Sequence, residues 1–285
     1  MKIIILYESE EWSTYALRDN IEKLGVSTEL VNMEQEIRSE IFDDCDLVVN
    51  RVFASAQFRG HEKSLKQMEE VLELLKKRHI PMVNPYRAHF YEINKELSTN
   101  TLRENSISVP EVYGTFHKES VWKLSLKYPC IIKPNCGGRT TCTYIIQDRH
   151  ELEQAIQEIP DIEMIAEEYI EPVYGYLTRI EVIDGMCKLI LKRSVTDNGL
   201  SAYHLGSKYE FYPECREQIK RTAIDAMRIL QIESGSLDII ENETGYYIID
   251  ANSVSNASED NTEMFHFDLM LETAKYIVKK IKNSL

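Results

Sequence analysis

Residues 236–252 read Ser-Leu-Asp-Ile-Ile-Glu-Asn-Glu-Thr-Gly-Tyr-Tyr-Ile-Ile-Asp-Ala-Asn. Two β-rich runs flank a polar centre at 242–245, which predicts a β-hairpin. In a register centred near Thr244, Asp238 lies opposite Asp250, and the alternation of side chains puts Asp250 and Asn252 on one face. Two neighbouring carboxylates in an apolar hairpin repel each other, and a cation removes that repulsion. Because Mg²⁺ prefers a few carboxylate or amide oxygens completed by water and phosphate, the hairpin predicts a magnesium site at Asp238, Asp250 and Asn252.

A second interpretation makes the same acids solvent-exposed residues of an ordinary turn. The flanking isoleucines argue against it, because Ile239, Ile240, Ile248 and Ile249 mark both strands as buried. A carboxylate on a buried strand needs a partner, and the metal supplies one.

A second constellation lies at 131–141, where an apolar strand runs into a glycine-containing loop. The strand delivers Lys133 to the mouth of the loop, Gly137 and Gly138 permit close backbone approach, and Arg139 and Thr140 add hydrogen-bond donors. Such a loop can present N–H groups to phosphates. It has neither the Walker spacing nor the dinucleotide-binding glycine pattern. Taken alone, the motif favours a plain hairpin turn.

The chain divides into three predicted units. Strand and helix signals alternate over residues 1–91, which predicts a parallel βαβ sheet. Antiparallel strands with segregated helices predict α+β structure for 92–166 and for 167–285. The expected strands are 2–7, 28–31, 46–50, 81–84, 130–133, 142–146, 178–183, 188–192, 236–241 and 246–252. The expected helices are 13–24, 62–78, 93–104, one carrying residues 152–159, one beginning after residue 213, and 267–280.

Composition excludes several functional classes. The 285 residues are 43% hydrophobic and 28% charged, with a net charge of −14, and a field of that sign repels nucleic-acid backbones. We therefore expect no nucleic-acid partner. No stretch approaches the roughly 18 apolar residues of a membrane span, and the N-terminus resembles no signal peptide. We expect a cytoplasmic protein whose six scattered cysteines are reduced thiols rather than zinc ligands.

The order and spacing of these pieces resemble the ATP-grasp superfamily, and within it the RimK-type glutamate ligases. The resemblance covers nearly the whole chain. The segments Asn50-Arg51, 59–61 and 83–95 resemble the pre-ATP-grasp domain and its junction, and Glu168-Tyr169-Ile170 resembles the adenine-binding hinge. The resemblance implies an α/β, Rossmann-like pre-ATP-grasp domain, followed by an α+β ATP-grasp fold of two lobes.

The resemblance also implies roles for individual residues. Lys95 and Lys133 match lysines that contact the nucleotide phosphates, and the loop Gly137-Gly138-Arg139-Thr140 matches the one that closes over them. Asp238, Asp250 and Asn252 match the metal-ligand positions. Arg179 matches an arginine near the transferred phosphate or the acyl substrate, and Lys192-Arg193 resembles a further basic pair on the next strand.

Two departures from the family pattern are visible. The family usually has a glutamate at the position of Asp250, and aspartate is one methylene shorter. It often has an acid near the position of Leu177 that holds the ribose, a role that leucine cannot fill.

Four further residues are candidates for substrate binding. Arg51 and Arg59 could bind a substrate carboxylate, and His204 could move a proton. Lys192 and Arg193 point to opposite faces of their strand, so only one of the two should enter the cleft. The polar segment 194–208 could be a mobile lid.

The implied function is an ATP-dependent carboxylate–amine ligase that uses Mg²⁺, with Mn²⁺ as a substitute. A substrate carboxylate takes the γ-phosphate to form an acyl phosphate, and an amine then displaces phosphate to form an amide. The expected partners are a small carboxylate and an amine, either of which could be an amino acid or part of a peptide. One alternative is amide or ester formation on a peptide or protein side chain. Another is a nucleotide-binding module without turnover. The sequence does not identify the oligomeric state.

Overall fold

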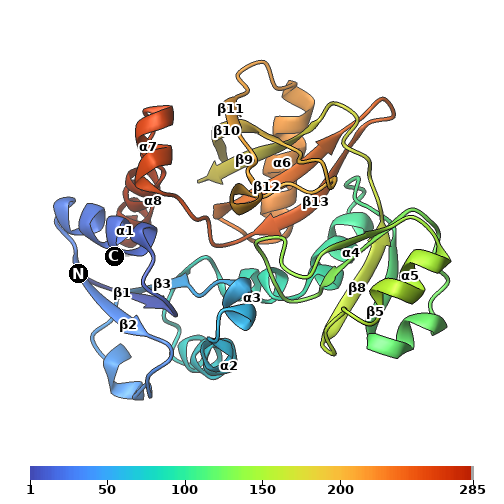
Figure 1. The fold of residues 1–285 in the computed structure, drawn as a ribbon. Coiled ribbons are helices and arrows are strands. Elements are labelled where there is room, and N and C mark those ends of the chain that lie inside the picture. Colours follow the sequence, from blue (N-terminus) through green and yellow to red (C-terminus); the bar gives the residue numbers. More distant parts are fainter. Residues whose placement is uncertain (284–285) are drawn as a thin grey trace.

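The first sheet is parallel, as the alternation of strand and helix signals predicts. The computed structural model, drawn in Figure 1, describes residues 1–283. The sheet has the order β2-β1-β3-β4, and every neighbouring pair runs parallel. Its strands are β1 (Lys2–Tyr7), β2 (Ser27–Asn32), β3 (Leu47–Arg51) and β4 (Met82–Val83).

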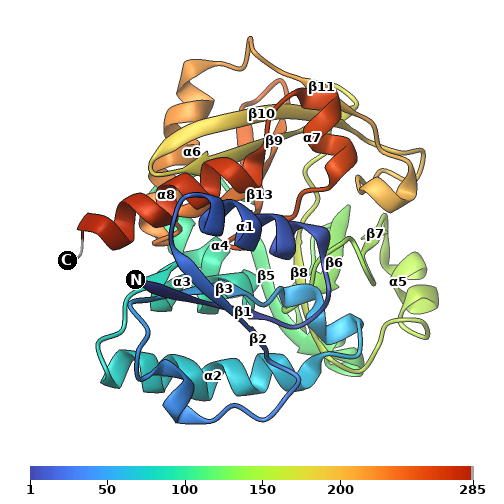
Figure 2. The same ribbon diagram turned by 90° about the vertical axis from the view of Figure 1, so that its left-hand side faces the viewer.

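Helices cover both faces of this sheet, and one of them comes from the other end of the chain. Helix α2 (Glu62–Lys77) packs Met68, Leu72 and Leu75 on one face. Helices α1 (Trp12–Lys23) and α8 (Leu269–Asn283) lie side by side on the other, as Figure 2 shows. The C-terminal helix therefore completes the core of the N-terminal sheet. The division of the chain into three units at residues 91 and 166 stays a prediction. Helix α8, at the end of the third predicted unit, packs on the sheet of the first.

The second sheet is antiparallel and has the order β5-β8-β6-β7. Its strands are β5 (Val112–His117), β6 (Cys130–Pro134), β7 (Tyr144–Ile146) and β8 (Glu163–Glu168). Helix α5 (Arg149–Ala155) packs Leu152 into the core of this sheet. Two short helices, α3 (Tyr86–Glu92) and α4 (Lys95–Glu104), connect it to the first unit.

The third sheet is antiparallel and has the order β11-β10-β9-β12-β13. Its strands are β9 (Tyr176–Ile183), β10 (Met186–Ser194), β11 (Tyr209–Phe211), β12 (Ser234–Glu241) and β13 (Tyr246–Asn252). Helix α6 (Glu217–Ile229) packs one face against Ile180, Val182 and Leu237. Because strand side chains alternate, the neighbouring residues Arg179, Glu181 and Asp238 point to the opposite face. That face faces the second sheet.

Three elements were not expected from the sequence. They are β5, the short strand β11 and helix α7 (Glu259–Phe265). Each is short or mixed in composition, so local periodicity is weak there, and each is stabilised by pairing with a distant segment. Strand β5, for example, pairs with β8, which lies some fifty residues further along the chain.

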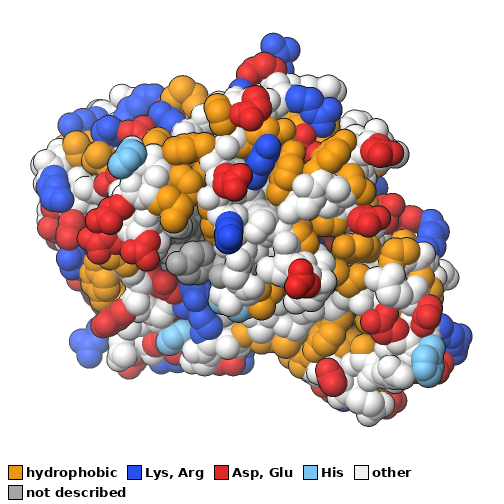
Figure 3. Space-filling view, turned by 45° about the horizontal axis from the view of Figure 1, so that its top comes forward, with side chains coloured by type: hydrophobic (Ala, Val, Ile, Leu, Met, Phe, Trp, Pro, Cys, Tyr) orange, Lys and Arg blue, Asp and Glu red, His pale blue; other side chains and the backbone are white. Residues whose placement is uncertain are grey.

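Within residues 1–283, no helix is long and apolar enough to cross a membrane. The six cysteines are all free thiols. Figure 3 shows one face of the molecule, on which acidic and basic side chains are interspersed with hydrophobic ones.

Candidate nucleotide and metal site

A cleft of about 550 Å³ opens between the two antiparallel sheets, a volume typical of small-molecule sites. The first sheet's loops and helix α4 close one end. Of the residues proposed from the sequence, fourteen line the cleft: Lys95, Lys133, Gly137, Gly138, Arg139, Thr140, Glu168, Tyr169, Ile170, Arg179, Arg193, Asp238, Asp250 and Asn252. His204 lines it too. The structure therefore brings distant parts of the chain into one cavity. Lys95 and Asn252, for example, are 157 positions apart in the sequence.

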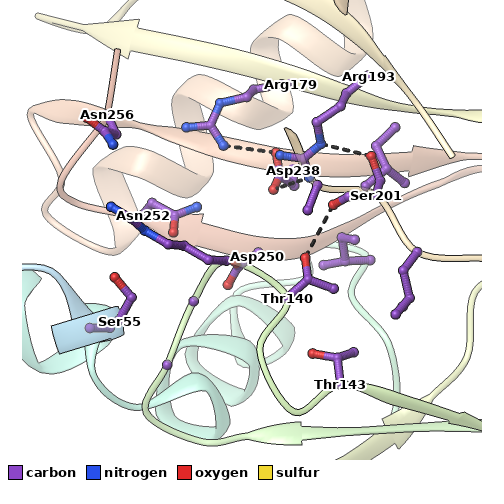
Figure 4. Close-up of a pocket in the computed structure, with 18 of the residues that line it drawn as sticks. Ser55, Thr140, Thr143, Arg179, Arg193, Ser201, Asp238, Asp250, Asn252 and Asn256 are labelled. Carbon is purple, nitrogen blue, oxygen red and sulfur yellow. Dashed lines mark hydrogen bonds and ion pairs between the residues drawn. The ribbon is translucent and has the colours of Figure 1, made fainter. Parts of the chain in front are cut away.

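The predicted hairpin is confirmed, and Asp238 on β12 pairs with Asp250 on β13 as expected. The register shifts between Asp238 and Ile239, so that nearer the turn Ile239 pairs with Ile248 rather than with Ile249. Asp238 is buried and lies between two arginines (Figure 4). Its Oδ1 lies 3.3 Å from Arg179 Nη1, and its Oδ2 lies 2.9 Å from Arg193 Nη2. Burial alone would raise the pKa of this carboxyl, but the two guanidinium groups outweigh burial and lower it. Asp238 is therefore ionised at neutral pH.

The second carboxylate of the hairpin is paired with the lysine at the start of α4. Lys95 Nζ lies 2.6 Å from Asp250 Oδ1. Asn94 caps the helix by accepting a hydrogen bond from the backbone N–H of Leu97, which fixes the position from which Lys95 extends. Burial lowers the pKa of Lys95, but the carboxylates of Asp250 and Glu92 outweigh burial, so that its pKa is raised overall. The ammonium is held charged inside the cleft.

The donor set at the hairpin fits a magnesium ion. Asp238, Asp250 and Asn252 offer hard oxygen ligands from two adjacent strands, which is the type and number that Mg²⁺ takes from proteins. Within residues 1–283, no group of three or more His, Cys, Asp or Glu side chains could hold a metal ion. That finding is compatible with Mg²⁺ at the hairpin, where two carboxylates and one amide leave positions for phosphate oxygens and water.

A second lysine approaches the same strand of the hairpin from β6. Lys133 Nζ donates to the backbone carbonyl oxygen of Ile249, at 3.1 Å, and lies 2.7 Å from Glu167 Oε2. The side chain of Glu167 is only 1% exposed. Lys133 and Lys95 thus reach neighbouring residues of β13 from two different elements. Their two ammonium groups form a cationic lining beside the predicted metal ligands.

The glycine loop spans the cleft. Arg139 and Thr140 both have positive φ angles, 59° and 58°, a left-handed conformation that is uncommon outside glycine. Arg139 Nη2 lies 2.5 Å from Glu11 Oε1, and Thr140 Oγ1 donates to the backbone carbonyl of Ser201, at 3.3 Å. A Cβ added at Gly138 would lie 3.5 Å from Ser55 Cβ. The loop therefore bridges the N-terminal unit and the segment 194–208.

The segment 194–208 covers the cleft as a loop with a short turn of 3-10 helix, Tyr203–Leu205. Arg193 Nε donates to Ser201 Oγ at 2.9 Å, and Ser201 Oγ donates to the carbonyl of Ser194. Figure 4 shows Ser201 between Arg193 and Thr140. Ser201 thereby joins the glycine loop, this covering loop and the basic residues of β10.

The predicted hinge, Glu168-Tyr169-Ile170, lines the cleft. Ile170, Leu177 and Ile240 form a small apolar cluster, with Ile249 packed against it. An apolar slot of this kind fits the faces of a flat heteroaromatic base. The backbone N–H of Glu168 donates to the carbonyl of Glu111 at 2.8 Å. Leu177 belongs to the apolar cluster, which agrees with its inability to hold a ribose hydroxyl.

Three of the four substrate-binding candidates lie away from the cleft lining. Arg51 is buried, donates to Ser255 O and Ser13 Oγ, and has its pKa lowered by burial to about 10. Arg59 pairs with Glu8 and Glu11. Lys192 lies 4.7 and 4.3 Å from the ring centroids of Tyr176 and Tyr212. As predicted, Lys192 and Arg193 point to opposite faces, and Arg193 is the one that enters the cleft.

Several lining residues were missed by sequence reasoning. Glu92 is buried beside Lys95, and burial raises the pKa of its carboxyl, although the backbone N–H of Ser253 donates to it. Ser55, Asn256 and Glu11 come from connecting loops. The one available signal was that Glu92 stands three residues before Lys95 at the unit junction. Loop positions carry no periodicity that could have identified the others.

Comparison with known proteins places these features in a family. A family model described as a RimK-like ATP-grasp domain matches residues 93–281. A D-alanine–D-alanine ligase of Pediococcus pentosaceus is 28% identical over 175 residues, which cover 57% of this chain and 49% of that protein. The chain thus spans about half the length of the curated relatives it matches.

Solved structures agree over nearly the whole chain. A RimK-domain ATP-grasp protein from Sphaerobacter thermophilus has a TM-score of 0.74 at 16% identity, covering 97% of this chain and 99% of its own. The ATP-grasp ligase PsnB, complexed with a phosphomimetic variant of a minimal precursor, Mg and ADP, has a TM-score of 0.66 at 15% identity, covering 97% of both chains. These likenesses confirm the predicted ATP-grasp fold.

Proposed function

The chain belongs to the RimK-like ATP-grasp family, and on that premise we propose that it is an ATP-dependent ligase joining a carboxylate to an amine through an acyl phosphate. The observation that carries the proposal is the pairing inside the cleft. Two acids of one hairpin, Asp238 and Asp250, are each bonded to cations from other elements. A metal–nucleotide complex carries both signs of charge. It can replace these ion pairs without leaving a buried charge unpaired.

The nucleotide lies along the cleft, with its base in the apolar slot of Ile170, Leu177 and Ile240 and its phosphates toward the hairpin. Lys95 and Lys133 bind the phosphates, and the loop at 137–140 presents backbone N–H groups to them. Asp238, Asp250 and Asn252 would hold Mg²⁺. When bound, Mg²⁺ neutralises phosphate charge and orients the phosphate oxygens.

The reaction needs alignment and charge stabilisation rather than a covalent nucleophile of the protein. A substrate carboxylate oxygen attacks the γ-phosphorus, the bond to the β-phosphate oxygen breaks, and ADP leaves. The amine then attacks the acyl carbon, phosphate leaves with the C–O bond electrons, and the amine nitrogen loses a proton. Arg179 and Arg193 stabilise the negative charge that develops in the first step. Holding the reactants in line can contribute roughly 7–11 kcal/mol.

A second candidate places one reacting group on a peptide. The observation that favours it is the structural match to PsnB, which extends over nearly the full length of both chains and was made with a precursor variant bound. In this version the nucleotide site and the acyl phosphate are the same, and only the substrate that enters the open end of the cleft differs.

The experiment is to measure ADP release with Mg²⁺-ATP and pools of carboxylates, amines and short peptides, and to weigh the product by mass spectrometry. Lys133→Ala and Asp250→Ala should abolish release. Lys127→Ala is the matched control, because this lysine is 68% exposed and pairs with Glu111 outside the cleft. Release that depends on both substrates and yields a condensed product supports the ligase, and the product mass separates free from peptide-borne substrates. ATP binding without turnover in every pool would overturn it in favour of a binding module.

A further inference from the structure

The cleft continues past the paired acids into a second apolar region. Its members are Leu189, Leu191, Tyr209, Phe265 and Phe267, which we call the distal apolar wall. They come from β10, β11, α7 and the segment before α8. The wall extends outward through Phe211, whose ring meets that of Phe265 edge-to-face with centroids 5.0 Å apart. Phe211 itself is 53% exposed.

The distal apolar wall is separate from the slot proposed for the base. On the cleft face of β10, Arg193, Leu191 and Leu189 follow one another at alternate positions, and they pair with Leu177, Arg179 and Glu181 of β9. With a rise of about 3.3 Å per residue, Leu189 lies about 13 Å beyond Arg193. The charged centre therefore divides the cleft into two apolar ends. Leu177 marks the base end, and Leu189 and Leu191 mark the other.

The start of α1 contributes an exposed aromatic side chain to the cleft, and the next residue, Ser13, donates to Asn256 Oδ1 at 2.6 Å, two residues before the N-cap of α7. Trp12 begins α1, lines the same cleft and is 38% exposed. Helix α7 lies above α1 in both Figure 1 and Figure 2. Aromatic side chains offer a large apolar contact area to a ligand. Leu189, Leu191 and Phe265 are already largely buried, so an apolar group placed against this wall would mainly remove the exposed surface of Trp12 from water.

We propose that one of the two substrates joined by this ligase carries a bulky aliphatic or aromatic side chain, seated between Trp12 and the distal apolar wall. The inference rests on the proposed function and names its substrate class. Arg179, which pairs in register with Leu191, places this subsite directly beside the reacting groups. A side chain such as that of leucine or phenylalanine fills the subsite, whereas a methyl group leaves it hydrated. Each added methylene in an apolar pocket is worth about tenfold or more in kcat/KM.

The test compares matched substrates that differ only in side-chain size, from alanine through valine and leucine to phenylalanine, each presented as amine and as carboxylate. ADP release should rise at least about tenfold from the alanine to the leucine or phenylalanine member of one series. Trp12→Ala and Phe267→Ala should reduce that preference about tenfold, mainly through KM. Trp122→Ala is the control, because this tryptophan is 42% exposed and stacks with Arg149 outside the cleft.

The outcomes separate this inference from the function on which it rests. If turnover is robust but fastest with alanine or glycine, or if Trp12→Ala and Phe267→Ala both keep the wild-type preference, the apolar subsite is wrong and the ligase stands. If no member of either series stimulates ADP release, the proposed function fails first. Binding of the larger compounds, followed by tryptophan fluorescence in wild type and Trp12→Ala, then shows whether the subsite exists without turnover.

Discussion

Asp238 of β12 stands opposite Asp250 of β13, and each carboxylate is bonded to a cation that another element supplies. Without such partners, two carboxylates on neighbouring strands would repel each other. Lys95 balances Asp250, while Arg179 and Arg193 balance Asp238. The acids that suit a metal and the bases that suit phosphate are therefore already held within reach of one another.

Replacing Asp250 by asparagine should weaken metal binding, because one of two anionic ligands becomes neutral. We expect the Mg²⁺ concentration needed for half-maximal ADP release to rise at least about tenfold. Asp250→Glu restores the residue type usual in the resembling family and should keep Mg²⁺ dependence within a few-fold of wild type. A magnesium titration of all three proteins checks this. An asparagine variant that titrates like wild type would remove Asp250 from the metal site.

Lys133 has two separable effects, one on nucleotide binding and one on stability. Lys133→Ala leaves the Glu167 carboxylate, 1% exposed, without its cation, which should cost about 3–5 kcal/mol of unfolding free energy. The double variant Lys133→Ala/Glu167→Gln removes that stranded charge and should regain most of the stability. It should not regain ATP affinity. Chemical unfolding and calorimetric ATP titration of both variants measure the two effects, and recovery of ATP binding in the double variant would contradict the phosphate role.

The hairpin was predictable because its information is local. The turn at 242–245 and the β-rich flanks predict the hairpin, and the structure reproduces the pairing of Asp238 with Asp250. The shift in register between Asp238 and Ile239, which this pairing requires, was not predicted. Local information also suffices for Lys192 and Arg193. Their opposite orientation follows from strand geometry alone.

Other parts of the site depend on contacts between distant segments, and no local pattern encodes them. The ion pair between Arg139 and Glu11 joins residues 128 positions apart. The packing of α8 on α1 joins the two ends of the chain. Arg51 and Arg59 were chosen as substrate ligands because arginine binds carboxylates, yet here they serve Ser255, Glu8 and Glu11. An arginine looks the same in sequence whether its partner is a substrate or its own protein.

The two glycines of the phosphate loop should differ in their tolerance of a methyl group. A Cβ at Gly137 would lie 2.9 Å from Phe58 Cε2 and 3.1 Å from Pro134 Cβ, whereas one at Gly138 makes only an ordinary contact of 3.5 Å with Ser55. Gly137→Ala should destabilise the fold by about 1–3 kcal/mol through overpacking. Gly138→Ala should stay within about 0.5 kcal/mol of wild type. Denaturant unfolding of both variants measures this difference. Equal free energies of unfolding would mean that Phe58 and Pro134 move aside without cost, which would contradict the prediction.

A buried histidine should make stability depend on pH. His89 lies in α3, where Asn50 Nδ2 is 3.2 Å from its Nδ1, and burial lowers its pKa from 6.5 to about 4. Between pH 6.5 and about 4, His89 is therefore protonated in the unfolded chain but neutral in the folded protein. The contribution is fully present above pH 6.5 and is lost as pH falls toward 4, by about 3 kcal/mol in total. The His89→Gln variant has no titrating group at this position. Whatever the substitution changes in the free energy of unfolding at neutral pH, that free energy should fall less steeply between pH 6.5 and about 4 than in the wild type. Urea unfolding of both proteins at several pH values gives the two slopes, and parallel slopes would show that His89 accepts its proton in the folded state.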